Sequence, residues 1–259
     1  LLVDQVLENR EGQVVTTGED GIPYVVKEWF QGNECNTRSR EDILKSLEAM
    51  AQLHMVMQME REDGMPGTNL LEECRKHNRE LRKTRKFVQK KKMKNPFEEL
   101  LAASITPFLE AGEMMVRELE NSGYEHFREE HSQAVCHGDC NQHNIIFSRE
   151  GAGFMNFEHW HYEPQTEDLC LFMRKILEKN NWDPALGRQM VEQYSRKRPL
   201  SDGEFRNLKL RLSYPWRYWK LVNYYAANQK VWISRKNIEK IEQATALWKP
   251  WQHFLRSFS

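Results

Sequence analysis

Residues 136–147, CHGDCNQHNIIF, constrain the possible fold more strongly than any other segment of this chain. The segment places a glycine-containing turn and several polar side chains between short apolar stretches, whereas most of the chain has apolar residues at helical spacing. Asp139 comes directly after Gly138 in this turn, so its carboxylate is free to point into a cleft. The segment therefore predicts a small β insert that carries a polar site within a mainly helical body.

The side chains expected to join Asp139 lie on the two strands that follow it. Asn144 begins one apolar run, and residues 154–158, FMNFE, form the returning run. Because alternate side chains of a strand share a face, Asn156 and Glu158 are expected to point the same way. Oxygen ligands of this kind suit Mg²⁺ that is shared with substrate phosphates, and phosphoryl transfer uses such a set. We therefore expect a hairpin that gathers these four side chains.

The rest of the chain divides into a short β-rich start and a long helical body. Residues 1–31 hold β-branched and aromatic runs separated by glycine-containing turns, and the spacing becomes helical in residues 32–259, interrupted by the insert at residues 134–160. His54 continues an apolar helical stripe, so we expect it to pack in the core. With 39% hydrophobic residues, the chain has enough material for a core, which excludes global disorder. The pattern predicts an α+β fold.

The charge balance excludes an evenly basic nucleic-acid-binding protein. Lysine plus arginine total 38 and aspartate plus glutamate total 38, so the net charge is zero. The basic run from Arg75 to Lys94 could bind an anionic partner, but its helical spacing favours a solvated helix face, and nucleic acid is not an expected partner. No run of about 18 apolar residues predicts a membrane-spanning helix. The start, Leu1 to Asp4, lacks the basic region of a signal peptide.

A zinc site is one alternative use of the same region. Cys136, Cys140 and His143, with His159 and His161 nearby, could hold zinc in an interaction module. The C-x-x-x-C spacing is not that of a zinc knuckle, and buried free thiols are the commoner case. The odd number of cysteines, five, also suits a reducing compartment better than a disulfide scaffold.

An aromatic cage is a second alternative. Several aromatic residues near the C-terminus could enclose a quaternary ammonium group, although their helical spacing favours core packing. These residues are Trp216, Trp219, Tyr224, Tyr225 and Trp232.

The motif H-G-D-x-x-x-H-N at 137–144, the triplet N-F-E at 156–158 and the pair D-L at 168–169 resemble the aminoglycoside phosphotransferase and choline kinase group. The closer resemblance is to the CotS family of bacterial spore-coat proteins. It is carried also by YVVKEWFQG, by a helix that ends MAQLH, by RKILEKNNWD and by YPWRYWKLVNYYAANQKVWI, and it runs from about residue 1 to residue 255. The resemblance implies a protein-kinase-like fold, in which a mainly helical C-lobe with a small β-hairpin insert follows a partial β-rich N-lobe.

The resemblance also implies a role for each matching residue. Asp139 matches the catalytic aspartate, and His137 matches the histidine that shapes its turn. Asn144 matches the metal-binding asparagine, and Asp168 matches the buried aspartate that braces the catalytic loop. The hinge that would offer backbone hydrogen bonds to the adenine of ATP matches four consecutive residues: Lys27, Glu28, Trp29 and Phe30.

Two departures from the family pattern predict weakened chemistry. The first aspartate of the D-F-D triplet, the main Mg²⁺ ligand in active relatives, is Asn156 in this chain. An amide keeps an oxygen donor but loses the negative charge on which hard cations depend, and Glu158 could compensate in part. Relatives also place a phosphate-covering loop and an ATP-pairing lysine ahead of the position numbered 1, so full phosphate binding is expected to require that upstream part.

Two functions therefore follow. The leading one is a CotS-type spore-coat protein, made in the cytoplasm and assembled with other spore-coat proteins, whose ATP and Mg²⁺ chemistry is weakened or lost. The alternative is an active kinase that transfers the γ-phosphate of ATP to a hydroxyl of a small substrate. In that case Asp139 would orient the acceptor, and Asn144 with Glu158 would hold Mg²⁺.

Overall fold

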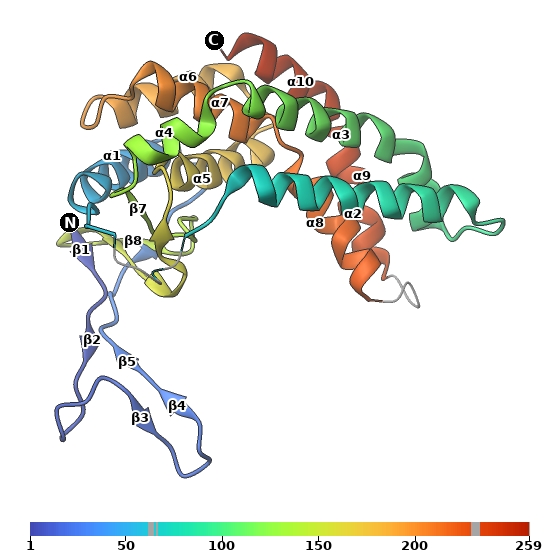
Figure 1. Cartoon of the computed structure of the whole chain (residues 1–259). Coiled ribbons are helices and arrows are strands. Elements are labelled where there is room, and N and C mark those ends of the chain that lie inside the picture. Colours follow the sequence, from blue (N-terminus) through green and yellow to red (C-terminus); the bar gives the residue numbers. More distant parts are fainter. Residues whose placement is uncertain (62–64, 66, 229–233, 259) are drawn as a thin grey trace.

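The structure consists of a helical body from which a narrow β ribbon projects (Figure 1). It is a computed structural model that describes residues 1–61, 65, 67–228 and 234–258. No described helix combines the length and the apolar character that crossing a membrane requires. The strands are all short. They are β1 (Leu2–Val3), β2 (Val6–Leu7), β3 (Thr16–Thr17), β4 (Pro23–Tyr24), β5 (Val26–Lys27), β6 (Asn33–Glu34), β7 (Val135–Cys136), β8 (Ile145–Ser148), β9 (Gly151–Phe154) and β10 (His161–Tyr162).

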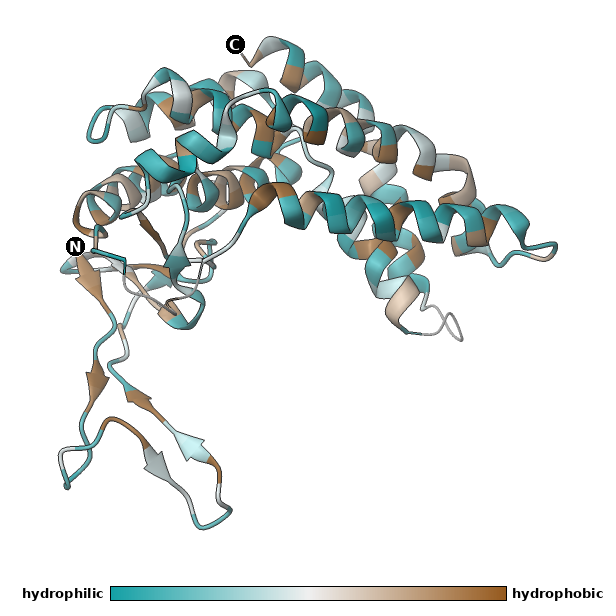
Figure 2. Cartoon of the chain, in the orientation of Figure 1, coloured by the Kyte–Doolittle hydropathy of each residue, from teal (hydrophilic) through white to brown (hydrophobic). Residues whose placement is uncertain are grey.

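The projecting ribbon is made of two antiparallel pairs, β2 with β5 and β3 with β4. Its strands carry apolar side chains that are exposed to solvent, and Figure 2 shows this apolar colour along the ribbon. The exposed apolar side chains of this part are Val6, Leu7, Val14, Val15, Ile22, Tyr24, Val25 and Val26.

A four-stranded sheet joins the start of the chain to the predicted insert. Its order is β1-β9-β8-β6, with β1 parallel to β9 and the other neighbours antiparallel. β8 and β9 form the predicted hairpin, in which Ile145 lies opposite Phe154. The β7–β10 pair lies beside the turn that carries Asp139.

Several helices begin at residues whose side chains cap them. They are α1 (Arg40–Val56), α2 (Leu70–Lys90), α3 (Pro96–Glu120), α4 (Tyr124–Glu130), α5 (Thr166–Lys179), α6 (Pro184–Ser195), α7 (Asp202–Leu212), α8 (Trp216–Ala227), α9 (Arg235–Ala246) and α10 (Trp248–Ser257). Asn95 caps α3 and Ser201 caps α7 in complete capping boxes, with Glu98 and Glu204 as the reciprocal partners. The side chain of Ser39 caps α1.

The core surrounds α5, which packs against α6 and α7. Phe172 and Ile176 of α5, Leu47 of α1 and Phe154 of β9 are all fully buried in one apolar cluster. Helix α2 packs along α3, and Arg75 and Arg82 form ion pairs with Glu120 and Glu113 of α3. Most other basic side chains of α2 are exposed, which agrees with a solvated helix face.

The prediction that the returning strand extends through Glu158 is wrong. β9 ends at Phe154, and residues Phe157–His159 form a 3₁₀ turn. Asn156 has a φ of 68°, a left-handed conformation that asparagine tolerates better than most residues, and its backbone N–H donates to Asp4 Oδ2 at 2.9 Å. This turn ends the alternation of side chains, so Asn156 and Glu158 do not share a strand face.

Candidate active site

A buried carboxylate, Asp168 in the first turn of α5, holds the loop that carries Asp139. Its Oδ2 accepts from the backbone N–H of His137 at 2.6 Å, and its Oδ1 accepts from that of Gly138 at 3.0 Å. The side chain of Asp168 is completely buried. Bonds to two successive N–H groups fix the direction of the backbone immediately before Asp139.

A second buried residue, His54 of α1, completes the support of Asp168. Its Nε2 lies 3.3 Å from Asp168 Oδ2 and its Nδ1 lies 2.7 Å from the Tyr194 hydroxyl. Burial lowers the pKa of His54, which favours the neutral ring. Burial alone would raise the pKa of Asp168, but the hydrogen bond from His54 and the other bonds to the carboxylate hold it below its ordinary value. We infer that neutral His54 donates from Nε2 to ionised Asp168 and accepts at Nδ1 from Tyr194.

His54 is thus buried as expected, but sequence reasoning missed its role. The apolar stripe of α1 predicted that His54 is buried, but it did not indicate which residues hydrogen-bond to the ring. The missed signal was a polar ring inside an apolar stripe, because a buried imidazole needs hydrogen-bond partners.

His137 shapes the turn from within. Its Nε2 lies 2.9 Å from the carbonyl oxygen of Met155, and its Nδ1 accepts from the backbone N–H of Asp139 at 3.2 Å. Gly138 has a φ of +80°, and a Cβ there would lie 1.9 Å from the carbonyl oxygen of His159. Only glycine fits this position, which explains why the turn has the sequence H-G-D.

Asp139, Asn144 and Asn156 are brought together, as the hairpin predicted. Asp139 Oδ2 accepts from Asn144 Nδ2 at 3.0 Å, and Asp139 Oδ1 accepts from Asn141 Nδ2 at 2.8 Å. Asn144 Oδ1 in turn accepts from Asn156 Nδ2 at 2.9 Å. Asn144 is buried, Asp139 is half-buried and Asn156 is exposed, so this hydrogen-bonded chain reaches solvent.

Glu158 does not join this group. Its carboxylate pairs with the ammonium group of Lys27, which also lies 3.4 Å from Asp4 Oδ2. The hydrogen bond from Lys27 is the main reason that the pKa of Glu158 is lowered. The left-handed residue Asn156 leads into the 3₁₀ turn that carries Glu158, and there the carboxylate meets Lys27 of β5 in the ribbon.

The segment predicted to be the hinge borders a surface cavity of about 630 Å³. Glu28, Trp29 and Phe30 line it together with the β8–β9 turn, and Trp29 is 79% exposed. Lys27 lies outside this lining, because its side chain turns to Glu158. The backbone N–H of Glu28 already donates to the carbonyl oxygen of Gln5 at 2.9 Å, so this N–H is engaged within the ribbon.

The donor set fits Mg²⁺ in kind but is short of charge. Asp139, Asn144 and Asn156 offer oxygen atoms, which Mg²⁺ prefers, yet only Asp139 is a carboxylate. The side-chain oxygens of Asp139 and Asn144 already accept hydrogen bonds within the group. A cation would have to displace these bonds with little compensating charge, so the fit predicts weak metal binding.

The zinc alternative receives no support. Cys136 and Cys140 are buried, and Cys136 Sγ lies 3.3 Å from the carbonyl oxygen of Glu163. Burial raises the pKa of both thiols, which disfavours the thiolate that binds zinc. In the described part of the chain, no three His, Cys, Asp or Glu side chains are grouped to hold a metal ion.

The aromatic residues pack rather than enclose a ligand. Trp219 stacks on the His77 ring with centroids 3.4 Å apart, whereas Tyr225 packs on Phe97 and Tyr224 is exposed. Trp232 lies outside the described residues.

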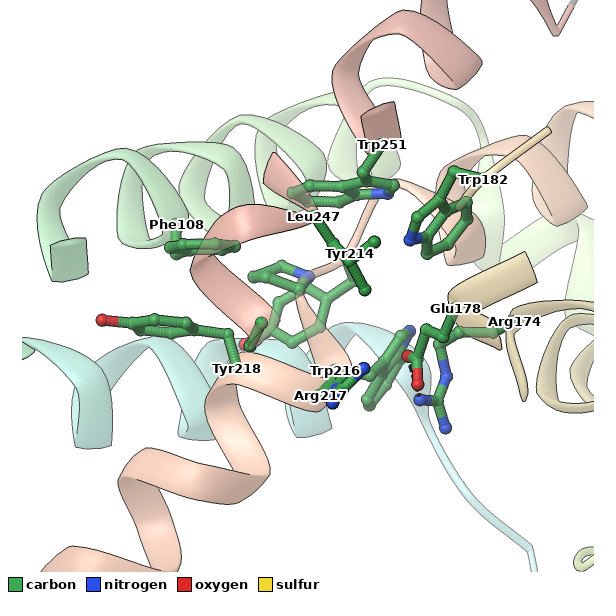
Figure 3. Close-up of a pocket in the computed structure, with 12 residues that line it drawn as sticks. Phe108, Arg174, Glu178, Trp182, Tyr214, Trp216, Arg217, Tyr218, Leu247 and Trp251 are labelled. Atoms are coloured by element: carbon green, nitrogen blue, oxygen red, sulfur yellow. Dashed lines mark hydrogen bonds and ion pairs between the residues drawn. The ribbon is translucent and has the colours of Figure 1, made fainter. Parts of the chain in front are cut away.

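A nearby aromatic pocket is also too small for a quaternary ammonium ligand. Trp216 lines it with neighbouring rings, and its cavity is about 40 Å³ (Figure 3). Small-molecule sites are several times larger, roughly 300–1,000 Å³.

Known structures share this architecture. An aminoglycoside phosphotransferase from Alicyclobacillus acidocaldarius subsp. acidocaldarius DSM 446 has a TM-score of 0.87 at 20% identity, with 100% of this chain and 77% of that chain covered. Spectinomycin phosphotransferase in complex with ADP and spectinomycin has a TM-score of 0.58 at 10% identity, with 94% and 72% covered. A choline kinase from Cryptosporidium parvum Iowa II has a TM-score of 0.53 at 11% identity, with 99% and 73% covered. The chain therefore has the predicted α+β, protein-kinase-like fold.

The sequence model of the family described as "Spore coat putative kinase YutH" matches residues 3–258. The chain belongs to this spore-coat family, which confirms the CotS-like resemblance. No curated protein matches the sequence.

Proposed function

We propose that this chain is a component of the spore coat that assembles with other coat proteins, on a kinase-like scaffold whose phosphoryl-transfer chemistry is weakened. The observation that carries the proposal is the contact between Asn156 and Asn144. A neutral amide occupies the position of the expected metal-binding aspartate, and it donates to Asn144, the second side chain expected to bind the metal. Because Mg²⁺ depends on charged ligands, this arrangement favours weak binding of Mg²⁺–ATP.

The proposed division of roles follows the geometry. Asp139 would orient a hydroxyl group, on a turn shaped by His137, and the oxygens of Asn144 and Asn156 would hold Mg²⁺. When bound, Mg²⁺ neutralises the charge of the phosphates. Residues 1–31 would be the remaining strands and hinge of an N-lobe, and residues 32–259 would be the C-lobe with its hairpin at 134–160.

The second candidate is an active kinase for a small hydroxyl-bearing substrate. The intact loop around Asp139 favours it, because the carboxylate is half-buried and its backbone is fixed by Asp168. Choline, named for one structural neighbour, shows the kind of hydroxyl compound that such a fold can use. The ADP in the spectinomycin phosphotransferase supports a nucleotide as the phosphate donor.

Measurements of nucleotide binding and of ATP turnover distinguish a coat protein with weakened chemistry from an active kinase. With millimolar Mg²⁺–ATP, we expect a rise in the melting temperature of the purified protein, because a ligand of the native state stabilises it. We expect ADP release far below the roughly 1–100 s⁻¹ of kinases, and Asp139→Asn should remove what remains. Turnover in the normal kinase range would contradict the weakened site, and no stabilisation at any ATP concentration would contradict a nucleotide site.

A further inference from the structure

An elongated groove lies between α3, α7 and α10, which Figure 1 shows on the upper side of the helical body, away from the projecting ribbon. Its volume is about 520 Å³. A neighbouring cavity of about 200 Å³ shares Arg206 and Leu210 with it and reaches α4, so the two cavities form one continuous groove. Neither lining includes a residue of the candidate active site, so the groove is a separate surface.

The groove has the dimensions and the apolar floor of a site for a helix. α3 lines it with residues at helical spacing from Pro107 to Glu118, a length of about 17 Å or three helical turns. On the floor, Met115 of α3 and Leu210 of α7 are buried in the same apolar cluster, whereas Met114 is 53% exposed. Grooves of this kind bind amphipathic helices that place apolar residues at positions i, i+3 or i+4, and i+7.

The two walls of the groove carry opposite charges. Glu110 and Glu118 lie on the wall formed by α3, whereas Arg206 and Lys209 of α7 and Arg256 of α10 lie on the other wall. Within the described ranges, none of these five side chains forms an ion pair or a hydrogen bond. A helix with the same charge on both edges would be attracted by one wall and repelled by the other. The walls therefore favour a helix that has acids along one edge and bases along the other.

We propose that this groove binds an amphipathic α-helix of another protein, with acidic residues along the edge that faces α7 and α10 and basic residues along the edge that faces α3. The inference rests on the proposed assembly with other coat proteins and adds the kind of segment that a partner supplies. Burial of apolar side chains against Met114 and the floor would supply most of the affinity, because exposed ion pairs contribute little each and mainly set specificity. A symmetric dimer would place the groove against its own copy and leave the hollow unfilled, so the concave shape favours a partner helix.

Binding is measured by calorimetry without nucleotide or Mg²⁺, with three synthetic peptides of about 18 residues that share one stripe of leucines at helical spacing. The first peptide has glutamate along one edge of the stripe and lysine along the other, the second has glutamate on both edges, and the third has lysine on both. Reversing the direction of a helix exchanges its edges, so the mixed peptide matches the walls in one of its two directions. We expect the mixed peptide to bind about tenfold more tightly than either of the others.

A variant of the floor tests whether the peptide lies in this groove. Met114→Gln should weaken binding of the mixed peptide by about fivefold, because it removes apolar contact area. Met55→Gln is the same change on a methionine of α1 that is 50% exposed and lies outside the groove, and it should leave binding unaltered. Both side chains are exposed, so we expect both variants to keep the melting temperature of the wild type, and a loss of binding cannot then be attributed to unfolding.

The contradicting outcomes are distinct. No binding of the mixed peptide, equal affinity for the three peptides, or equal affinity of the wild type and Met114→Gln would overturn the proposal. A dimer in sedimentation that Met114→Gln dissociates would also overturn it, since a second copy of the chain would then occupy the groove. Because the peptides bind without nucleotide, ATP turnover in the normal kinase range would count against the proposed function alone.

Discussion

The two sides of the candidate site differ in how their polar groups are satisfied. On the buried side, Asp168 keeps a full negative charge and accepts from two backbone N–H groups and from His54. On the side that faces solvent, Asn144 and Asn156 donate to their neighbours in a chain that ends on Asp139. On the buried side, the charge of Asp168 fixes the backbone of the loop. On the side that faces solvent, the two asparagines are neutral and add no negative charge that could bind a cation.

The difference shows that the loop geometry does not depend on the chemistry that the loop would serve. Asp168 fixes the turn through bonds that need neither metal nor nucleotide. An amide at position 156, where the family pattern has an aspartate, therefore leaves the bonds that hold the backbone before Asp139 in place. A kinase-like scaffold would in this way persist with the weakened metal site that we propose.

Removing the charge of Asp168 should have the largest effect. In Asp168→Asn, an amide would lose the charge-assisted bonds and leave buried donors poorly paired. We expect the free energy of unfolding to fall by about 3–5 kcal/mol, measured by urea denaturation. Asp183→Asn, the same change at an exposed N-cap where both residues are favourable, should cost well under 1 kcal/mol. Equal losses in the free energy of unfolding for the two variants would show that the buried charge of Asp168 does not stabilise the fold more than an exposed cap does.

The buried side should also respond to pH through His161, which lies 3.1 Å from Glu167, the residue before Asp168. Burial alone would lower the pKa of His161, but Glu167 outweighs it and raises the pKa to about 9. The His161–Glu167 pair therefore contributes fully to the free energy of unfolding below pH 6.5. This contribution, about 3 kcal/mol in all, is lost as the pH rises towards 9 and beyond.

The unfolding free energy of the wild type and of His161→Gln, measured between pH 6 and pH 9.5, tests this. The variant should lack most of the decline, whereas His126→Gln, at an exposed histidine, should retain it. If the free energy of unfolding depends on pH in the same way in the wild type and in His161→Gln, His161 does not cause the decline.

The sequence alone predicted the parts of the site that depend on residues close together in the chain. The H-G-D turn and the hairpin predicted that Asp139, Asn144 and Asn156 would meet, because both depend on residues that are close in the sequence. The predicted strand conformation of residues 155–158 was wrong because Asp4, 152 positions away, binds the backbone of Asn156.

The contacts that sequence reasoning missed join distant parts of the chain. Lys27 and Glu158 are 131 positions apart, and His54 and Asp168 are 114 positions apart. Helical periodicity predicts that His54 is buried, but it carries no information about which polar group the ring meets. Such partners are set by how the elements pack, which a single sequence pattern does not specify.

The Mg²⁺ dependence of ATP binding in Asn156→Asp tests the central claim most directly. At fixed ATP, Mg²⁺ is titrated while nucleotide binding is followed by calorimetry, with Asn121→Asp at the exposed C-cap of α3 as the matched change of charge. We expect Asn156→Asp to lower the half-saturating Mg²⁺ concentration by about tenfold, since a charged ligand strengthens a hard-cation site, and Asn121→Asp to leave it unaltered. An unchanged Mg²⁺ requirement in Asn156→Asp would contradict the claim that this amide weakens the site.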